Sequence, residues 1–125
     1  MQKPIILKGK VVHGKGLGRT VGMPTANLLI VGGELPQAGV YATKVRVGNQ
    51  TKYSVTNIGT RPTVDDDCEI TVEVNIFDFN DDIYGENVTL EVYKFLRPIV
   101  KFHNLQEVQR QVSKDIVFAK EFFGI

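Results

Sequence analysis

The sequence is poor in the residues that build disulfide frameworks and metal clusters. Its 125 residues include one cysteine, two histidines and no tryptophan. The single cysteine, Cys68, cannot form an intramolecular disulfide, and no Cys/His spacing indicates a zinc site. We therefore expect a reducing, cytoplasmic setting for this chain.

An excess of one charge and long apolar runs are also lacking. Fifteen basic and fourteen acidic residues give a formal net charge of +1, so we expect no broad electrostatic surface for nucleic acid or an anionic membrane. No apolar run is long enough to span a bilayer, and Met1–Val12 lacks the continuous apolar core of a signal peptide. The chain is thus expected to have neither nucleic-acid nor membrane partners, and any phosphate binding must be local.

The length and the strand pattern indicate one β-rich domain covering residues 1–125. Strand-like segments, rich in β-branched residues and bounded by turn residues, dominate the first three quarters. They are Ile5–Val12, Ala26–Ile30, Gly39–Val47, Thr51–Ile58, Glu69–Asp78 and Asn87–Leu96. Gly48–Gln50 and Phe79–Gly85 are predicted to connect hairpins. Antiparallel strands with no helix between them indicate a closed barrel or a sandwich.

One long helix is predicted at the C-terminal end. Asn104 followed by Glu107 resembles a capping box with Asn at the cap position. Apolar residues then recur at helical spacing and form one stripe: Leu105, Val108, Val112, Ile116, Ala119 and Phe123. We expect this helix to pack on the barrel wall or to cover one open end.

A glycine-rich segment directly after the first predicted strand is the most informative stretch. Its glycines fall within nine positions: Gly14, Gly16, Gly18 and Gly22. Clustered glycines let backbone N–H groups approach a phosphate, and Lys15 and Arg19 would add positive charge. The dinucleotide fingerprint fails at Arg19, and the sequence has no Gly-Lys-Ser/Thr tripeptide for a P-loop. The residues alone leave both a phosphate-binding loop and a mobile hairpin loop open.

The segment Met23–Asn27, which reads Met-Pro-Thr-Ala-Asn, follows these glycines. On an extended chain Thr25 and Asn27 point the same way. A hydroxyl and an amide carbonyl are neutral oxygen donors, which suit Mg²⁺ when ATP phosphates supply the negative ligands. A polar turn leading into the next strand is the alternative interpretation.

Phosphorylation of an alcohol needs a base near the hydroxyl. Glu69–Ile76 alternates strictly and puts Glu73 on the face opposite the aliphatic row. A carboxylate held rigidly in a strand could be this base, and a solvent-facing strand glutamate is the alternative. The run Asp65–Asp67 is better explained as an exposed loop, because consecutive acids point in alternating directions.

Three further residues could stack on or flank a flat aromatic ligand: Tyr84, Arg97 and Phe102. Taken singly, each has an ordinary alternative, namely a turn aromatic, a surface charge and a core residue.

With these residues in view, the chain resembles the riboflavin kinase (flavokinase) family, especially the kinase module of bacterial bifunctional riboflavin kinase/FAD synthetases. The resemblance runs from about Gly9 to Phe122 and rests on motifs in a fixed order. They are Gly14–Asn27, Gly39–Ala42, Asn57–Thr63, Thr71–Val74, Asp78–Phe79, Tyr84–Gly85, Phe95–Pro98 and Lys101–Phe102. The most specific of them is Gly-x-Pro-Thr-Ala-Asn, here Gly22–Asn27.

The resemblance implies a mainly β fold, a six-stranded antiparallel Greek-key β-barrel with a C-terminal α-helix. It implies an ATP-dependent riboflavin kinase that transfers the γ-phosphate of ATP to the ribityl 5′-hydroxyl of riboflavin, giving FMN and ADP. It further implies Mg²⁺, or Zn²⁺ in some members, as the metal, and we expect a monomer.

The resemblance also implies roles for individual residues. Glu73 would be the catalytic base, and Thr25 and Asn27 would bind the metal. The expected ATP-binding residues are Gly14, Lys15, Gly18, Arg19, Gly22 and Thr25. The expected flavin-binding residues are Ile76, Asp78, Tyr84, Arg97 and Phe102.

The chain departs from the family pattern in two ways. Ile99 stands where many members have glutamate after Arg-Pro, which bears on flavin affinity and on closure around Arg97. The nucleotidyltransferase domain that usually precedes the bacterial module is not in this sequence, so FMN rather than FAD is the expected product. A non-catalytic flavin- or nucleotide-binding barrel is the alternative function, and the balanced charge counts against an oligonucleotide-binding barrel.

Overall fold

Strands account for most of the described chain, and a helix follows them. The computed structural model describes residues 3–12, 25–62, 68–79 and 82–125. Its elements are β1 (Ile5–Val12), β2 (Thr25–Gly32), β3 (Gly39–Val47), β4 (Gln50–Pro62), β5 (Cys68–Ile76), β6 (Asn87–Arg97) and α1 (Leu105–Phe123). All predicted strands and the helix are present, with β2 and β4 longer than predicted. Across the described ranges, no helix is both long and apolar enough to cross a membrane.

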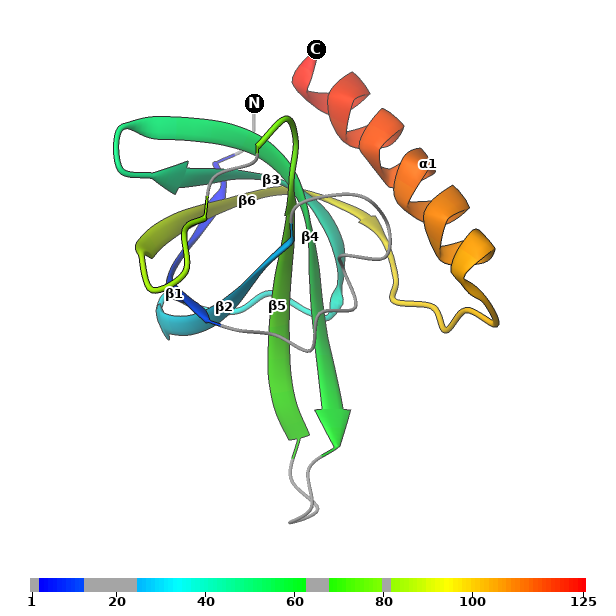
Figure 1. Cartoon of the computed structure of the whole chain (residues 1–125), viewed down its shortest axis with the longest axis horizontal. Coiled ribbons are helices and arrows are strands. Elements are labelled where there is room, and N and C mark those ends of the chain that lie inside the picture. The colour runs from blue at the N-terminus through cyan, green and yellow to red at the C-terminus, as the bar shows by residue number, and fades with distance from the viewer. Residues whose placement is uncertain (1–2, 13–24, 63–67, 80–81) are drawn as a thin grey trace.

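The strands close into an antiparallel barrel in the order β1-β2-β5-β4-β3-β6 (Figure 1). β3, β4 and β5 are neighbours in sequence and in space, and β6 returns to lie beside β3, which is the Greek-key order. Pairing of β6 with β1 closes the ring. The expected six-stranded antiparallel Greek-key barrel is thus confirmed.

One predicted hairpin is confirmed and the other is wrong. Val47 pairs with Gln50, so Gly48 is the first residue of a tight loop between β3 and β4, at φ +57°. β5 pairs with β2 and β4, whereas β6 pairs with β1 and β3. The segment Phe79–Gly85 therefore does not join hairpin partners. Two strands with alternating apolar residues and a turn between them give the same sequence pattern in a hairpin and in a Greek-key crossover. Contacts across the whole sheet decide which strands pair with each other.

Alternate residues of the strands fill the barrel interior. In β5, Val72, Val74 and Ile76 belong to the core, as the alternation predicts. Ile70 continues the same alternation but is 52% exposed. β2 pairs with β5 only as far as Val72, and Ile70 pairs with Thr60 in the part of the β4–β5 hairpin that extends past the barrel (Figure 1). The alternation predicts the face of a strand but not where the barrel ends.

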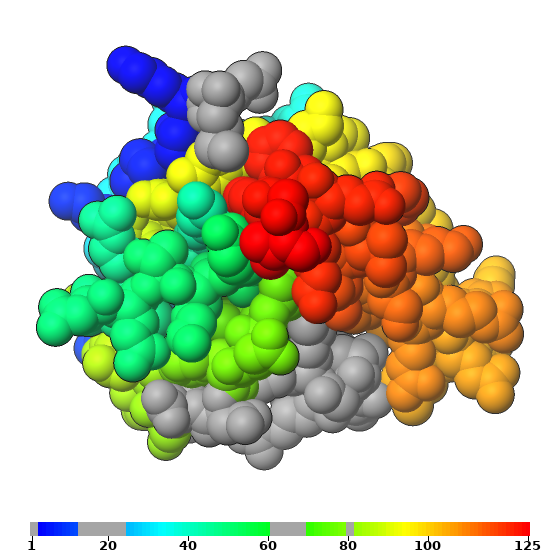
Figure 2. Space-filling model, turned by 90° about the horizontal axis from the view of Figure 1, so that it is seen from above, coloured from blue at the N-terminus to red at the C-terminus, as the bar shows by residue number. Residues whose placement is uncertain are grey.

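The helix α1 packs against the outer faces of β3, β4 and β6 (Figure 2). Its predicted cap is confirmed, since the Asn104 side-chain oxygen accepts the Glu107 backbone N–H at 2.9 Å. The Glu107 carboxylate accepts the N–H of His103 at 3.0 Å, one residue before the position expected in a capping box. Further along, Ala119 is fully buried in a second apolar cluster with Val40. Of the two predicted placements, the barrel wall is the correct one.

Aromatic side chains fasten the C-terminal end of α1. The Phe123 ring centroid lies 4.9 Å from that of Tyr53 and 5.5 Å from that of Tyr93. The Lys44 ammonium lies 5.1 Å from the Tyr93 ring centroid and 5.6 Å from that of Phe123. Ring pairs and a cation over their faces add attraction beyond the burial of apolar area. This contact fixes how the helix lies on the barrel.

Two glycines with positive φ provide a test of the chain path. Gly33 has φ +96°, and a Cβ there would collide with the carbonyl oxygen of Ile6, whereas a Cβ at Gly48 would meet nothing within 4 Å. We expect Gly48→Ala to lower the free energy of unfolding by about 1 kcal/mol, for the left-handed backbone alone. Gly33→Ala should lower it by about 3 kcal/mol because it adds a steric clash with backbone. Denaturant unfolding measures both, and equal losses would contradict the close approach at Gly33.

Candidate active site on the outer wall of the barrel

The register between β2 and β5 places the predicted metal ligands beside the predicted base. Asn27 is the direct partner of Glu73, and Thr25 is the partner of Asn75. Directly opposed residues of antiparallel strands point to the same face, with Cβ atoms about 5 Å apart. Because Ala26 lies in the core, these four side chains point outward. Thr25, Asn27 and Glu73 therefore share one patch on the outer wall.

A second amide side chain flanks Glu73 on its other side. In the β4–β5 pair, Asn57 is the partner of Glu73. Asn57 is in turn the partner of Val40, and Val40 is the partner of Arg97. One line of outward residues thus crosses five strands, and we call it the transverse row: Asn27, Glu73, Asn57, Val40 and Arg97.

Thr25 and Asn75 form an oxygen-rich pair next to the Asn27 end of the transverse row. The Thr25 hydroxyl donates to the Asn75 side-chain oxygen at 3.0 Å, and Asn75 is buried. Within the described residues, no three His, Cys, Asp or Glu side chains gather as a metal site. The donors present are the neutral oxygens of Thr25 and Asn27. These fit a hard divalent cation that takes its negative ligands from phosphate.

Glu73 is a half-buried carboxyl within this patch. Burial raises its pKa above the ordinary value, because desolvation disfavours the charged form. A carboxylate with a raised pKa is a stronger base than one in water. Glu73 is therefore not fully solvated, and its role as a base stays a prediction.

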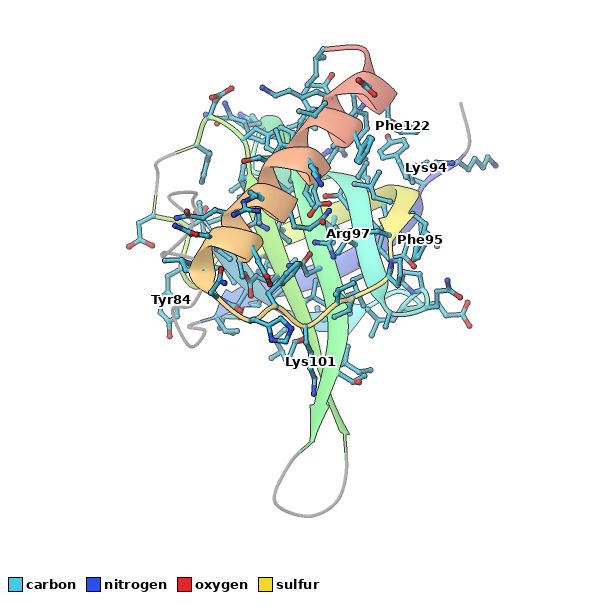
Figure 3. All side chains as sticks on the ribbon, turned by 90° about the vertical axis from the view of Figure 1, so that its right-hand side faces the viewer. Tyr84, Lys94, Phe95, Arg97, Lys101 and Phe122 are labelled. Atoms are coloured by element: carbon cyan, nitrogen blue, oxygen red, sulfur yellow. The ribbon has the colours of Figure 1, made fainter. Side chains whose placement is uncertain are left out.

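Arg97 lies at the other end of the transverse row, beside α1 (Figure 3). Its Nε donates to Asp115 Oδ1 at 2.8 Å and its Nη2 donates to Oδ2 at 2.7 Å. The guanidinium carbon lies 5.8 Å from the centroid of the Phe102 ring. Two of the predicted flavin-binding residues, Arg97 and Phe102, are therefore in contact.

The local sequence patterns indicate no role for Asn57 or Asp115, although Asn57 lies on this wall and Asp115 binds Arg97 at its end. Asn57 belongs to a motif of the resemblance, but only the β4–β5 register places it beside Glu73. The position of Asp115 in the helical pattern does indicate a buried charge. This residue follows Val112 by three residues and precedes Ala119 by four, which puts it on the apolar face of the helix. A charged residue in that position indicates a buried partner, because an unpaired buried charge is costly.

The remaining predicted flavin residues lie elsewhere on the molecule. Asp78, at φ +51°, and Tyr84 are exposed residues of the β5–β6 connection. In Figure 3, Tyr84 and Arg97 lie on either side of the ribbon of α1. Ile76 is only 1% exposed, because the alternation of β5 turns it inward with Val74. Its side chain therefore lies in the core, and its expected place beside the flavin stays a prediction.

The predicted phosphate-binding residues of the glycine-rich segment lie outside the described residues: Gly14, Lys15, Gly18, Arg19 and Gly22. Thr25 is the one predicted ATP-binding residue that the structure describes.

The fold is a closed antiparallel barrel whose outer wall carries a half-buried carboxyl between neutral oxygen donors. The family model of riboflavin kinase matches residues 1–123. The bifunctional riboflavin kinase/FMN adenylyltransferase of Listeria monocytogenes is 40% identical over 122 residues, which is 97% of this chain and 39% of that protein. The chain belongs to the riboflavin kinase family. It spans about two fifths of the length of the curated relatives it matches.

Solved structures agree with this assignment. Riboflavin kinase from Trypanosoma brucei superposes with a TM-score of 0.64 and 25% identity, over 98% of this chain and 82% of that chain. A Streptococcus pneumoniae crystal structure described as a macrolide-efflux protein superposes with a TM-score of 0.88 and 37% identity, over 94% of this chain and 38% of that chain. The barrel with its C-terminal helix is therefore shared with a solved riboflavin kinase.

Because Glu73 is half-buried, we expect its negative charge to lower the stability of the folded chain. A half-buried carboxylate has lost part of its hydration, whereas a glutamine of the same shape is neutral and cheaper to desolvate. We expect Glu73→Gln to raise the thermal unfolding midpoint at neutral pH by about 2–4 °C. Calorimetry measures the shift, and a lower midpoint would show that the charge stabilises the fold.

Proposed function

We propose that this chain is an ATP-dependent riboflavin kinase. It transfers the γ-phosphate of ATP to the ribityl 5′-hydroxyl of riboflavin and releases FMN and ADP. The observation that carries the proposal is the register that pairs Asn27 with Glu73, with Thr25 one pair away. This register supports a metal-bound phosphate and an alcohol meeting on one wall. Membership of the riboflavin kinase family supports the choice of substrates.

Thr25 and Asn27 would hold the divalent metal, Mg²⁺ or Zn²⁺, through their neutral oxygens. When bound, the metal neutralises negative charge on the phosphate oxygens. The Asn75 side-chain oxygen accepts a hydrogen bond from the Thr25 hydroxyl, which orients that hydroxyl. The strand β2 thereby presents two oxygen donors at fixed spacing.

Glu73 accepts the proton of the ribityl hydroxyl. As the hydroxyl oxygen bonds to the γ-phosphorus, the bond from that phosphorus to the bridging oxygen breaks and ADP leaves. Phosphoryl transfer depends on positioning more than on strong base chemistry, and a carboxyl held in a central barrel strand is well positioned. Its raised pKa adds to its strength as a base.

The two substrates would occupy opposite parts of the wall. Arg97 and Phe102, which are in contact, would border the flavin ring, and Asp78 and Tyr84, which lie apart from them on the exposed β5–β6 connection, would have to approach the ring to border it as well. The triphosphate is held by Thr25 and by the glycine-rich segment: Gly14, Lys15, Gly18, Arg19 and Gly22. In this proposal residues 1–125 form one domain that acts as a monomer in the cytoplasm, without nucleic-acid or membrane partners.

The role of Glu73 is tested by removing its charge. Glu73→Gln is expected to lower kcat by about 10²-fold or more, because the hydroxyl loses its base. Binding of ATP should stay close to that of the unaltered chain. Chromatography of riboflavin, ATP and Mg²⁺ reaction mixtures measures FMN. Glu91→Gln is the matched control, since Glu91 is an outward β6 residue paired with Arg46. Near-normal turnover in Glu73→Gln would remove this residue from the mechanism.

The role of Asn27 is tested by metal titration. Asn27→Ala removes one neutral oxygen donor and should raise the Mg²⁺ concentration for half-maximal activity by about tenfold or more. Asn87→Ala, which removes an exposed amide at the start of β6, should leave that concentration unchanged. The same metal dependence in both variants would argue against a metal ligand at Asn27.

A further inference from the structure

The ion pair between Asp115 of α1 and Arg97 of β6 is largely buried. Asp115 is 2% exposed and is the one acidic or basic side chain fully buried among the described residues. Its carboxylate accepts two N–H groups of Arg97 and one of Gln111, the last at 3.1 Å. A buried ion pair adds little stability over a well-packed apolar pair. Its presence therefore points to a role in addition to stability.

Arg97 keeps donors for a ligand after all these contacts are made. A guanidinium has five N–H groups. Asp115 takes two of them, and the carbonyl of Pro98 takes one from Nη1 at 3.2 Å. One N–H on Nη1 and one on Nη2 remain. The Arg97 side chain is 18% exposed, so it is partly open to solvent while Asp115 fixes its orientation.

The remaining donors belong to the same transverse row as the proposed base. Arg97 and Glu73 are separated by β3 and β4, whose residues in the row are Val40 and Asn57. Neighbouring strands lie about 4.8 Å apart, so the two groups are on the order of 14 Å apart across the wall. A molecule with a polar planar ring at one end and a terminal hydroxyl at the other matches this separation, and it would pass beside Val40, because that residue is buried against Ala119 of α1.

We propose that Asp115 is a positioning residue for the acceptor substrate. By holding the Nε–Nη2 edge of the Arg97 guanidinium, it aims the two remaining N–H groups at the carbonyl oxygens of the flavin ring. Gln111 supports Asp115 from the same helix. The inference rests on the proposed function, and it makes α1 part of the acceptor site rather than only a cover for the barrel.

The test is riboflavin binding measured by quenching of its own fluorescence, together with KM for each substrate. Asp115→Asn removes the charge that orients Arg97 and keeps the shape. Its Kd and KM for riboflavin should rise about tenfold, with KM for ATP unchanged. Arg97→Gln should show the same loss. The double variant should be no weaker than Arg97→Gln alone, because Asp115 acts through Arg97.

Thermal unfolding and a control variant separate positioning from stability. Glu91→Gln removes the charge of Glu91 from its pair with Arg46, 3.3 Å apart, and should leave the riboflavin Kd unchanged. A lower unfolding midpoint in Asp115→Asn with unchanged Kd and KM would make the pair purely structural and overturn the proposal. Additive losses in the double variant would also overturn it.

A further variant tests the positioning role, and the binding measurement separates it from the kinase activity. If Asp115→Asn does not fold, Gln111→Leu removes one donor to Asp115 and leaves the Arg97 pair, and it should weaken riboflavin binding by about threefold. An unchanged Kd there would refute the positioning role. Because Kd requires no turnover, a chain that binds riboflavin but makes no FMN would contradict the proposed kinase activity alone.

Discussion

The pairing of β5 with β2 on one side and β4 on the other is the constraint on which the candidate site depends. This double pairing puts Glu73 between Asn27 and Asn57. A slip of one residue in either pair would turn the partner to the opposite face and dismantle the patch. The closed ring resists such a slip, because β5 has a neighbour along both edges. The chemistry therefore depends on backbone hydrogen bonds of the sheet.

The filled interior explains why the site lies on the outside of the barrel. A six-stranded barrel is narrow, and its inward side chains occupy the space. Even the buried polar groups there satisfy one another, with Thr43 bonded to Ser54 at 2.7 Å and to Thr56 at 2.8 Å. The proposed site therefore lies on the outer wall of the barrel, where α1 packs against the strands and the Arg97–Asp115 pair joins the helix to β6.

Local sequence patterns predicted much of this architecture, but they could not predict which distant segments pair. Alternation in β5 correctly placed Val72 inside and Glu73 outside, and spacing identified the Asn104 cap. The position of Asn57 beside Glu73 and the partner of Arg97 depend on contacts between distant segments, which no local pattern encodes. The same limit explains why the β5–β6 crossover resembled a hairpin. The motifs of the family resemblance supplied the candidate site residues, and the register shows which of the described ones lie side by side.

Transfer of label from γ-labelled ATP to riboflavin by the unaltered chain tests the central claim most directly. With Mg²⁺ present, the account predicts labelled FMN formed in step with ADP. Label recovered only as inorganic phosphate, or riboflavin that binds and stays unphosphorylated, would contradict the claim that this wall brings an alcohol and a metal-bound triphosphate together.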